Sequence, residues 1–322
     1  MEAPAPRSAP AARAAVACLL AAVAAALALR PRFLPQLGAC TPPGLQAGAP
    51  AAPLGRCTDG ESPGRWEPAA SGAAGPAVVD GRRWAPRYCR YKDVSPARAR
   101  ECLAGAWVHL AGDSTSRHLF EGLLDALECP LEDRTTPAEA QRFDKTFACD
   151  AGGSNNTRVT HLFKGQIWAQ RAPRRGRAGD DDVHNSFFRA CAAAGRWPDV
   201  LVLNVGAHHA IAWSGRLPAA LDAAQLAADA AAFLAMLHDE LKFPGRVVWW
   251  RGHALREGKA RVFYDDAGEA LAEAFRARGA EVADFRATTV GAAPEAGNGV
   301  HYPQLKGLHA NILLNVLCPA AG

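Results

Sequence analysis

The sequence predicts an α/β fold in which a mostly parallel sheet lies between two layers of helices. Strand-like apolar runs alternate with helical patterns from residue 106 to residue 317, and such alternation is typical of parallel sheets with helices on both faces. One run, Asp199–Gly206, is almost continuously apolar, as expected for a strand that is buried on both faces. The chain of 322 residues is long enough for one large domain of this kind.

The most informative stretch is Val108–His118, which predicts a short strand, a sharp turn and the start of a helix. Gly112 permits backbone angles that other residues avoid. The polar residues after it are good helix N-caps, and leucines then follow at helical spacing. Ser114 therefore lies at the carboxyl end of a strand, beside backbone N–H groups that can stabilise an oxyanion. From the local sequence, both a simple N-cap and a nucleophile remain open for Ser114.

Apolar patterns predict the remaining elements of the domain. Helices are expected at Ser95–Leu103, Pro218–Lys242, Ala267–Arg278 and His301–Leu317, and strands at Val159–Trp168, Asp199–Gly206, Arg246–Trp250 and Ala280–Phe285. Residues 130–158 are predicted to be loops. Residues 171–182 are a polar loop with opposed charge blocks, which is either a solvated surface or a basic patch for an acidic glycan.

The N-terminus predicts entry into the secretory pathway. Residues 14–29 are uncharged and apolar, with arginines on both sides. An uncleaved signal anchor (14–34) behind a cytoplasmic tail (1–13) and a cleaved signal peptide both fit this pattern. The basic residues directly after the run favour the anchor. An organellar transit peptide is the third alternative.

Cysteine usage agrees with a luminal domain. Of nine cysteines, eight follow the apolar run, and an even set in a luminal chain predicts disulfides of unknown pairing. Asn155 begins a glycosylation sequon. Residues 35–80 are rich in Pro, Gly and Ala and predict a stem or linker, which leaves residues 81–322 as the folded domain. The cysteines lack the CxxC spacing of a zinc site, so no bound metal is expected. The net charge of +4, without a recognition motif, argues against nucleic-acid binding.

Three polar clusters follow predicted strands. The first contains Ser114, the second contains Asn204 and Gly206, and the third precedes His301. Ligands gather at this edge of parallel sheets, so His301 is the candidate base for Ser114, and Asn204 is a candidate amide donor to an oxyanion. Taken alone, His301 also fits a structural histidine and Asn204 an ordinary turn residue.

On these motifs the chain resembles the SGNH/GDSL hydrolase superfamily, and more closely its PC-esterase branch. That branch includes the plant trichome-birefringence-like polysaccharide O-acetyltransferases and the luminal sialic-acid O-acetyltransferase domain. The resemblance covers about residues 57–318. It is carried by Gly112-Asp113-Ser114, Asn204-x-Gly206, the terminal Gly-Val-His-Tyr-Pro, Cys57…Gly64-Arg65-Trp66, Trp84-Ala85-Pro86…Cys89 and the last helix ending at Cys318.

The resemblance implies a three-layer α/β/α domain of the SGNH-hydrolase type that follows a membrane anchor and stem. Ser114 would be the nucleophile and His301 the base, with Gly112, Asn204 and Gly206 near the oxyanion and substrate. The expected activity is a luminal O-acetyltransferase of the Golgi membrane that acts on a glycan, with an acetyl donor as co-substrate and no tightly bound cofactor. A secreted protein, a carbohydrate or lipid esterase and an inactive glycan-binding pseudoenzyme are the alternatives.

One residue departs from the family pattern of Asp-x-x-His. Position 298 is Asn in this chain. An asparagine carbonyl can accept a hydrogen bond from the histidine N–H and hold its tautomer, but it brings no charge to stabilise an imidazolium. Asp284 is the nearest carboxylate at a predicted strand end and is therefore the candidate substitute.

Overall fold

The computed structural model describes residues 54, 56–57, 60, 63–129, 145–149, 157–163, 180–204, 223–254, 259–290, 292 and 301–318. The strands are β1 (Gly64–Pro68), β2 (Val78–Val79), β3 (Arg82–Pro86), β4 (Trp107–Gly112), β5 (Lys145–Cys149), β6 (Thr157–Phe163), β7 (Val200–Asn204), β8 (Arg246–Arg251) and β9 (Glu281–Asp284). The helices are α2 (Pro96–Cys102), α3 (Ser114–Ala126), α5 (Asp180–Ala194), α7 (Ala223–Ala235) with a π-helical turn (Met236–Glu240), α8 (Lys259–Arg276), α9 (Arg286–Thr289), a 3-10 turn (Pro303–Leu305) and α10 (Lys306–Leu317).

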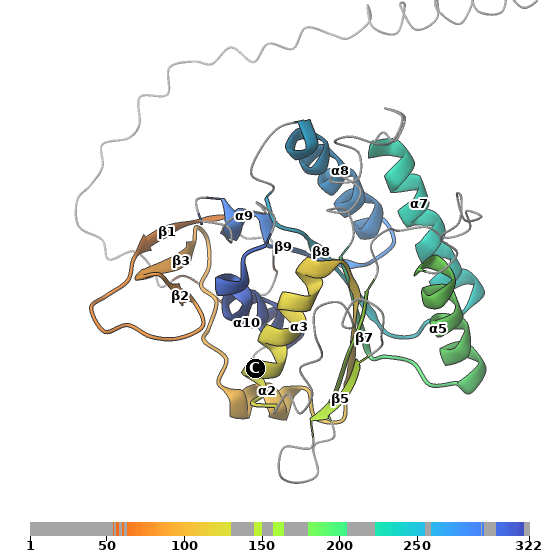
Figure 1. Ribbon diagram of the computed structural model, residues 1–322, viewed down its shortest axis with the longest axis horizontal. Helices are drawn as coiled ribbons and strands as arrows, with labels where there is room; N and C mark the ends of the chain where they lie inside the picture. The colour runs from red at the N-terminus through yellow and green to blue at the C-terminus, as the bar shows by residue number, and fades with distance from the viewer. Residues whose placement is uncertain are drawn as a thin grey trace, which may run out of the picture. The chain divides into compact units, whose positions relative to one another are not determined.

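A six-stranded sheet forms the centre of the domain (Figure 1). Its strand order is β5-β6-β4-β7-β8-β9. The strands from β6 to β9 in this order are parallel to one another, whereas β5 pairs antiparallel with β6 at one edge. The predicted α/β class with a mostly parallel sheet is therefore confirmed.

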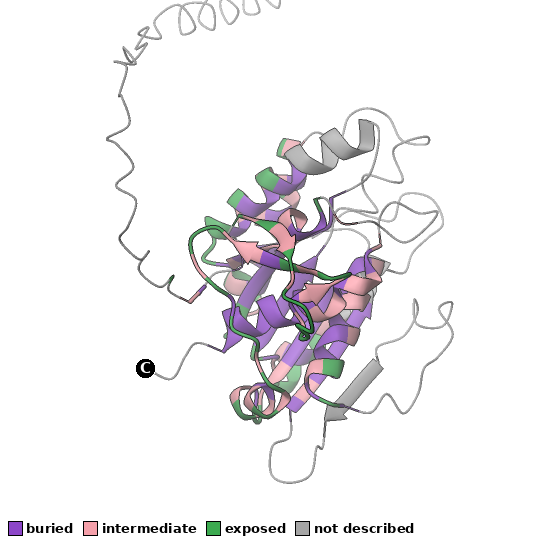
Figure 2. Ribbon diagram, turned by 90° about the vertical axis from the view of Figure 1, so that its left-hand side faces the viewer, coloured by how far each residue is buried: buried purple, intermediate pink, exposed green. Residues whose placement is uncertain are grey.

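Both faces of the sheet are covered by helices. In β7, Val200 and Val202 pack into one core with α3 and α10, whereas Leu201 and Leu203 pack into a second core with α5, α7 and α8. This alternation follows from the period of two along a strand. The buried residues lie mainly in the sheet and on the helix faces that touch it (Figure 2). The predicted three-layer arrangement is thus present in the described residues.

Several elements begin or end where the sequence predicts. Helix α2 has Ser95 as its N-cap, with the side chain accepting from Arg98 N–H, and Pro96 in its first turn. Two predictions were wrong. Strand β5 lies within the predicted loop 130–158, and α5 begins at Asp180, inside the predicted polar loop 171–182. Helix α8 also begins eight residues before Ala267. Short edge strands and polar first turns carry little apolar periodicity, so a pattern search passes over them.

The folded unit begins before residue 81. Strands β1, β3 and β2 form a small antiparallel sheet, and the chain from Pro53 onward belongs to one compact unit. Trp66 packs edge-on against Trp84 with ring centroids 5.5 Å apart, and a disulfide joins Cys57 to Cys89. The predicted stem (35–80) is therefore too long at its C-terminal end, because cross-strand pairing gives structure to a segment whose composition resembles a linker.

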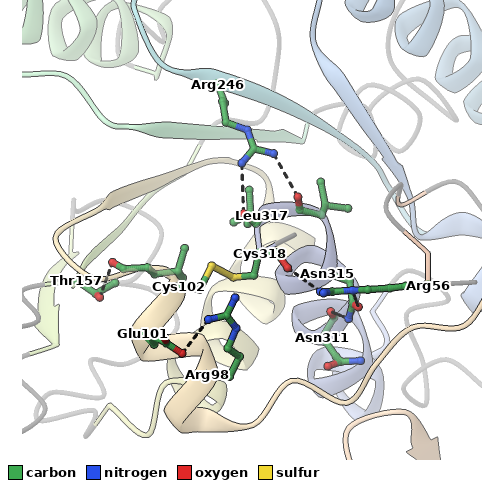
Figure 3. Close-up of a disulfide and its surroundings, with 12 residues drawn as sticks. Arg56, Arg98, Glu101, Cys102, Thr157, Arg246, Asn311, Asn315, Leu317 and Cys318 are labelled. Atoms are coloured by element: carbon green, nitrogen blue, oxygen red, sulfur yellow. Dashed lines mark hydrogen bonds and ion pairs between the residues drawn. A yellow bond between two sulfur atoms is a disulfide. The ribbon is translucent and has the colours of Figure 1, made fainter. Parts of the chain in front are cut away.

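The C-terminus of α10 is fixed by covalent and polar contacts (Figure 3). A disulfide joins Cys102 to Cys318. Arg56 Nη2 donates to the Cys318 carbonyl at 2.6 Å, and Arg246 donates to the carbonyls of Val316 and Leu317 at 3.2 and 3.4 Å. Cationic side chains satisfy the last carbonyls of a helix and complement its dipole. The end of α10 is therefore held from three directions.

The disulfides indicate an extracellular or secretory location, because such bonds persist in oxidising compartments. No helix within the described part of the chain is long and apolar enough to cross a membrane. The predicted signal anchor (14–34) and cytoplasmic tail (1–13) lie outside the described residues.

Helix α3 packs closely on α10 at Gly122. A Cβ atom at this position would meet the Lys306 carbonyl oxygen, with the Lys306 carbonyl carbon 2.7 Å away. We predict that Gly122→Ala lowers the free energy of unfolding by about 1–3 kcal/mol, because one backbone would have to shift. Urea denaturation would measure this loss. The matched change Gly307→Ala meets its nearest atom at 3.8 Å and should be tolerated. Equal effects of the two changes would contradict close packing at Gly122.

Candidate active site

The turn between β4 and α3 holds Ser114 at the first position of the helix. Asp113 is the N-cap and is fully buried. Its Oδ1 accepts from Thr115 N–H at 2.9 Å and from Thr115 Oγ1 at 2.6 Å. Its main-chain carbonyl accepts from the Ser116 hydroxyl at 2.7 Å. These bonds fix the backbone on both sides of Ser114.

The structure brings Ser114 and His301 together. Ser114 Oγ lies 2.7 Å from His301 Nε2, although the two residues are 187 positions apart in the sequence. His301 directly precedes Tyr302, the N-cap of the 3-10 turn that leads into α10, and α10 packs on α3. A hydroxyl at this distance can pass its proton to the imidazole, which is the geometry that a serine nucleophile requires.

One backbone donor at the site has no acceptor among the described residues. Thr115 N–H is taken by the Asp113 side chain, and Ser116 N–H by the Asp113 carbonyl at 3.1 Å. Ser114 N–H is at the first helical position, where no intrahelical acceptor exists, and no described residue accepts from it. A donor at a helix N-terminus beside the nucleophile can stabilise the oxyanion of a tetrahedral intermediate.

Asn204 does not have the position predicted for an oxyanion donor. Its Nδ2 donates to the Trp250 carbonyl at 3.0 Å, and its Oδ1 lies 3.1 Å from Thr115 Oγ1. The residue is only 1% exposed. The amide therefore links β7 to β8 and to the first turn of α3, because the end of β7 faces protein groups on both sides.

Gly112 is required by close packing of the backbone. It pairs with Asn204 in the parallel ladder between β4 and β7. A Cβ atom there would meet the Asn204 carbonyl oxygen and lie 2.8 Å from Ser116 Cβ. Gly112, which the sequence predicted near the substrate, therefore allows β4 to lie close to β7 and to the first turn of α3.

The described contacts of Asp284 are with arginine residues and not with His301. It lies on β9, three strands from β4 in the sheet order, which corresponds to about 14 Å. One carboxylate oxygen lies 3.5 Å from Arg251 Nη1, and the other accepts from Arg286 N–H at 2.9 Å. Burial raises the pKa of Asp284, and the nearby Arg251 charge opposes this shift. The carboxylate serves a local ion pair, because the β8–β9 register sets it opposite Arg251.

Three predicted residues lie outside the described part of the chain: Asn298, Gly206 and Asn155. In contrast, His118 and Glu121 were missed. The His118 ring is 5.4 Å from the His301 ring, and Nδ1 lies 3.5 Å from Glu121 Oε2. Their signal was helical spacing, since His118 is one turn after Ser114. Among the described residues, no group of three or more His, Cys, Asp or Glu side chains could hold a metal ion.

A second serine–histidine contact supports the turn from inside the protein. Ser116 Oγ lies 2.7 Å from His161 Nε2. Since the Ser116 hydroxyl donates to Asp113, His161 Nε2 must carry the proton that it donates to Ser116. Burial, with a smaller effect of the Arg117 charge, lowers the pKa of His161 to about 4. His161 is therefore neutral near pH 7 and serves as a structural donor.

Residues 84–211, about two-fifths of the chain, match the family model described as the NXPE family member 4-like, C-terminal domain. The match includes Ser114 but ends before His301. No curated protein matches the chain.

Solved structures give distant likenesses. A member of the lipolytic G-D-S-L family from Veillonella parvula is 14% identical over 66% of this chain and 97% of its own, with a TM-score of 0.39. The acetylxylan esterase Axe2 from Geobacillus stearothermophilus is 12% identical over 66% and 94%, with a TM-score of 0.42. The acetyl xylan esterase AlAXEase is 13% identical over 64% and 97%, with a TM-score of 0.41. Likenesses at this level do not define an activity.

The neutral state of His161 predicts a pH dependence of stability. The folded-state pKa of about 4 is below the ordinary 6.5, so the unfolded chain takes up a proton first as the pH falls. Stability should therefore be lost between about pH 6.5 and pH 4. We predict that His161→Gln, which retains a donor, removes up to about 3 kcal/mol of this loss. Urea denaturation at several pH values would test it, with His238→Gln as the matched substitution. If the free energy of unfolding depends on pH in the same way in the wild type and in His161→Gln, the prediction is contradicted.

Proposed function

We propose that this protein is an acyl-ester enzyme that uses Ser114 as its nucleophile and His301 as its base. The main observation in favour of this proposal is the 2.7 Å contact between Ser114 Oγ and His301 Nε2. It is supported by the Ser114 N–H at the start of α3, which has no acceptor among the described residues, and by the turn that fixes both groups. Together they provide a nucleophile, a proton acceptor and an oxyanion donor at one point.

In the first half-reaction, Ser114 Oγ attacks the carbonyl carbon of an acetyl donor while His301 Nε2 takes the serine proton. The resulting oxyanion accepts a hydrogen bond from Ser114 N–H. The intermediate then collapses, the bond to the leaving group breaks, and His301 returns the proton to that group. The product is an acetyl ester on Ser114.

In the second half-reaction, His301 removes a proton from the acceptor hydroxyl, which attacks the acetyl-serine. The oxyanion again accepts from Ser114 N–H, and its collapse gives the proton back to Ser114 Oγ. The same steps transfer the acetyl group to a sugar hydroxyl or to water. Transfer requires that water be excluded from the site.

We infer that the acceptor is a glycan hydroxyl, which makes the protein an O-acetyltransferase. This rests on the resemblance to the PC-esterase branch, and the chemistry of the Ser114–His301 pair is equally suited to a carbohydrate or lipid esterase. A luminal enzyme held in the Golgi membrane by residues 14–34, glycosylated at Asn155, fits the sequence. The acetyl donor would be a co-substrate, with no tightly bound cofactor.

We predict that the purified luminal part gains one acetyl group on Ser114 after exposure to an activated acetyl ester. Ser114→Ala should lose the label and lower ester turnover by about 10⁴-fold or more, because the covalent step is removed. His301→Gln should also block labelling, since glutamine cannot act as the base. Tandem mass spectrometry distinguishes Ser114 from Ser116, and hydrolysis of the ester gives the rate.

Ser95→Ala is the matched serine control, because Ser95 caps α2 and is exposed. Transfer of a labelled acetyl group to an oligosaccharide would identify a transferase, and release only to water would identify an esterase. A clean absence of labelling with several donors would contradict the acyl-enzyme and favour a glycan-binding pseudoenzyme.

A further inference from the structure

Helix α3 presents a second imidazole to the candidate base. His118 is four residues after Ser114, so both side chains lie on the same face of the helix. The His118 ring meets the His301 ring edge-on, with centroids 5.4 Å apart and planes at 76°. The His118 side chain is only 12% exposed. His118 is therefore a packed residue within the site.

Glu121 is the acidic neighbour of His118. Its Oε2 lies 3.5 Å from His118 Nδ1, and its Oε1 lies 3.8 Å from Arg117 Nε. The interaction with His118 lowers the pKa of Glu121 more than burial raises it, with smaller contributions from Arg117 and Lys306. Glu121 is therefore an ionised carboxylate near pH 7, held between two neighbours about one helical turn after His118.

A negative charge near His301 favours proton transfer to its ring. When it takes the Ser114 proton it becomes a cation, and a negative charge nearby stabilises that state. Asn298 is neutral, and the Asp284 carboxylate on β9 is paired with Arg251 on β8. Glu121 is connected to His301 through a single ring, that of His118.

We propose that His118 is a positioning residue that holds the His301 ring toward Ser114, and that Glu121 fixes His118 and supplies negative charge to the base. This inference rests on the proposed function. Arg117 on α3 and Lys306 on α10 oppose the carboxylate, but Lys306 is paired with Asp125 at 2.7 Å. The net contribution of Glu121 is therefore a partly compensated negative charge.

Packing and charge can be separated with substitutions at His118. His118→Ala removes the ring and should lower kcat by about 10- to 100-fold, with little change in KM, because a small displacement of a reacting group is costly. His118→Phe retains the ring edge and should restore kcat to within about threefold of the wild type. If the alanine variant matches the wild type, or the phenylalanine variant is no better than alanine, positioning by the ring is overturned.

The charge is tested at Glu121. Glu121→Gln should move the acid limb of the pH–rate profile to lower pH by about 0.5 unit, because loss of the carboxylate disfavours the imidazolium. Glu128→Gln is the matched control, since it neutralises an exposed carboxylate just after α3 that is paired with Arg100 and not with Lys306, and should leave the limb in place. Equal shifts in the two variants, or no shift in either, would overturn this role of Glu121.

A readout without turnover keeps this inference separate from the proposed function. NMR of ¹⁵N-labelled histidines follows the titration midpoint of the His301 ring directly. Glu121→Gln should lower that midpoint relative to Glu128→Gln, and His118→Ala should broaden or shift the His301 signals, which His118→Phe should restore. If the wild type forms no acyl-enzyme, the proposed function fails, and these spectra still confirm or overturn the support of His301.

Discussion

The candidate site depends on the buried carboxylate of Asp113. A buried charge is costly unless it is hydrogen-bonded, and here Thr115 provides both a backbone N–H and a hydroxyl to the same oxygen. The N-terminus of α3 adds a favourable dipole. Because the carbonyl of Asp113 also accepts from Ser116, one residue sets the backbone before and after Ser114. The direction of the serine side chain is therefore a property of the fold.

The base reaches the same point through a different set of constraints. Helix α10 is buried from Leu308 to Leu317, and Asn311 and Asn315 accept from the backbone N–H groups of Val94 and Lys92. The segment before α2 is thereby bound along the helix, whose end is held by the Cys102–Cys318 disulfide. Since α3 contacts α10 closely at Gly122, Ser114 and the segment of His301 that leads into α10 are held by the same packed pair of helices.

Local patterns predicted the strand, the turn and the helix around Ser114, because each depends on residues close in sequence. Local patterns also predicted that Ser114 and His301 lie together, because both were placed at the edge of the sheet where ligands bind. The orientations of Asn204 and Asp284 could not be predicted in this way. Asn204 is turned toward the Trp250 carbonyl, and Asp284 toward Arg251. Both depend on strand register and on the direction of a side chain, which are set by residues distant in sequence.

Helix α3 carries three of the groups that form the candidate site. Ser114, its N–H and His118 lie on one helix, and the Asp113 cap and the buried His161 fix the start of that helix. A displacement of α3 would move Ser114 Oγ, Ser114 N–H and the His118 ring together, so the distances among these three groups would be kept. Substitutions on other segments that leave α3 in place therefore leave the relative geometry of these three groups unchanged.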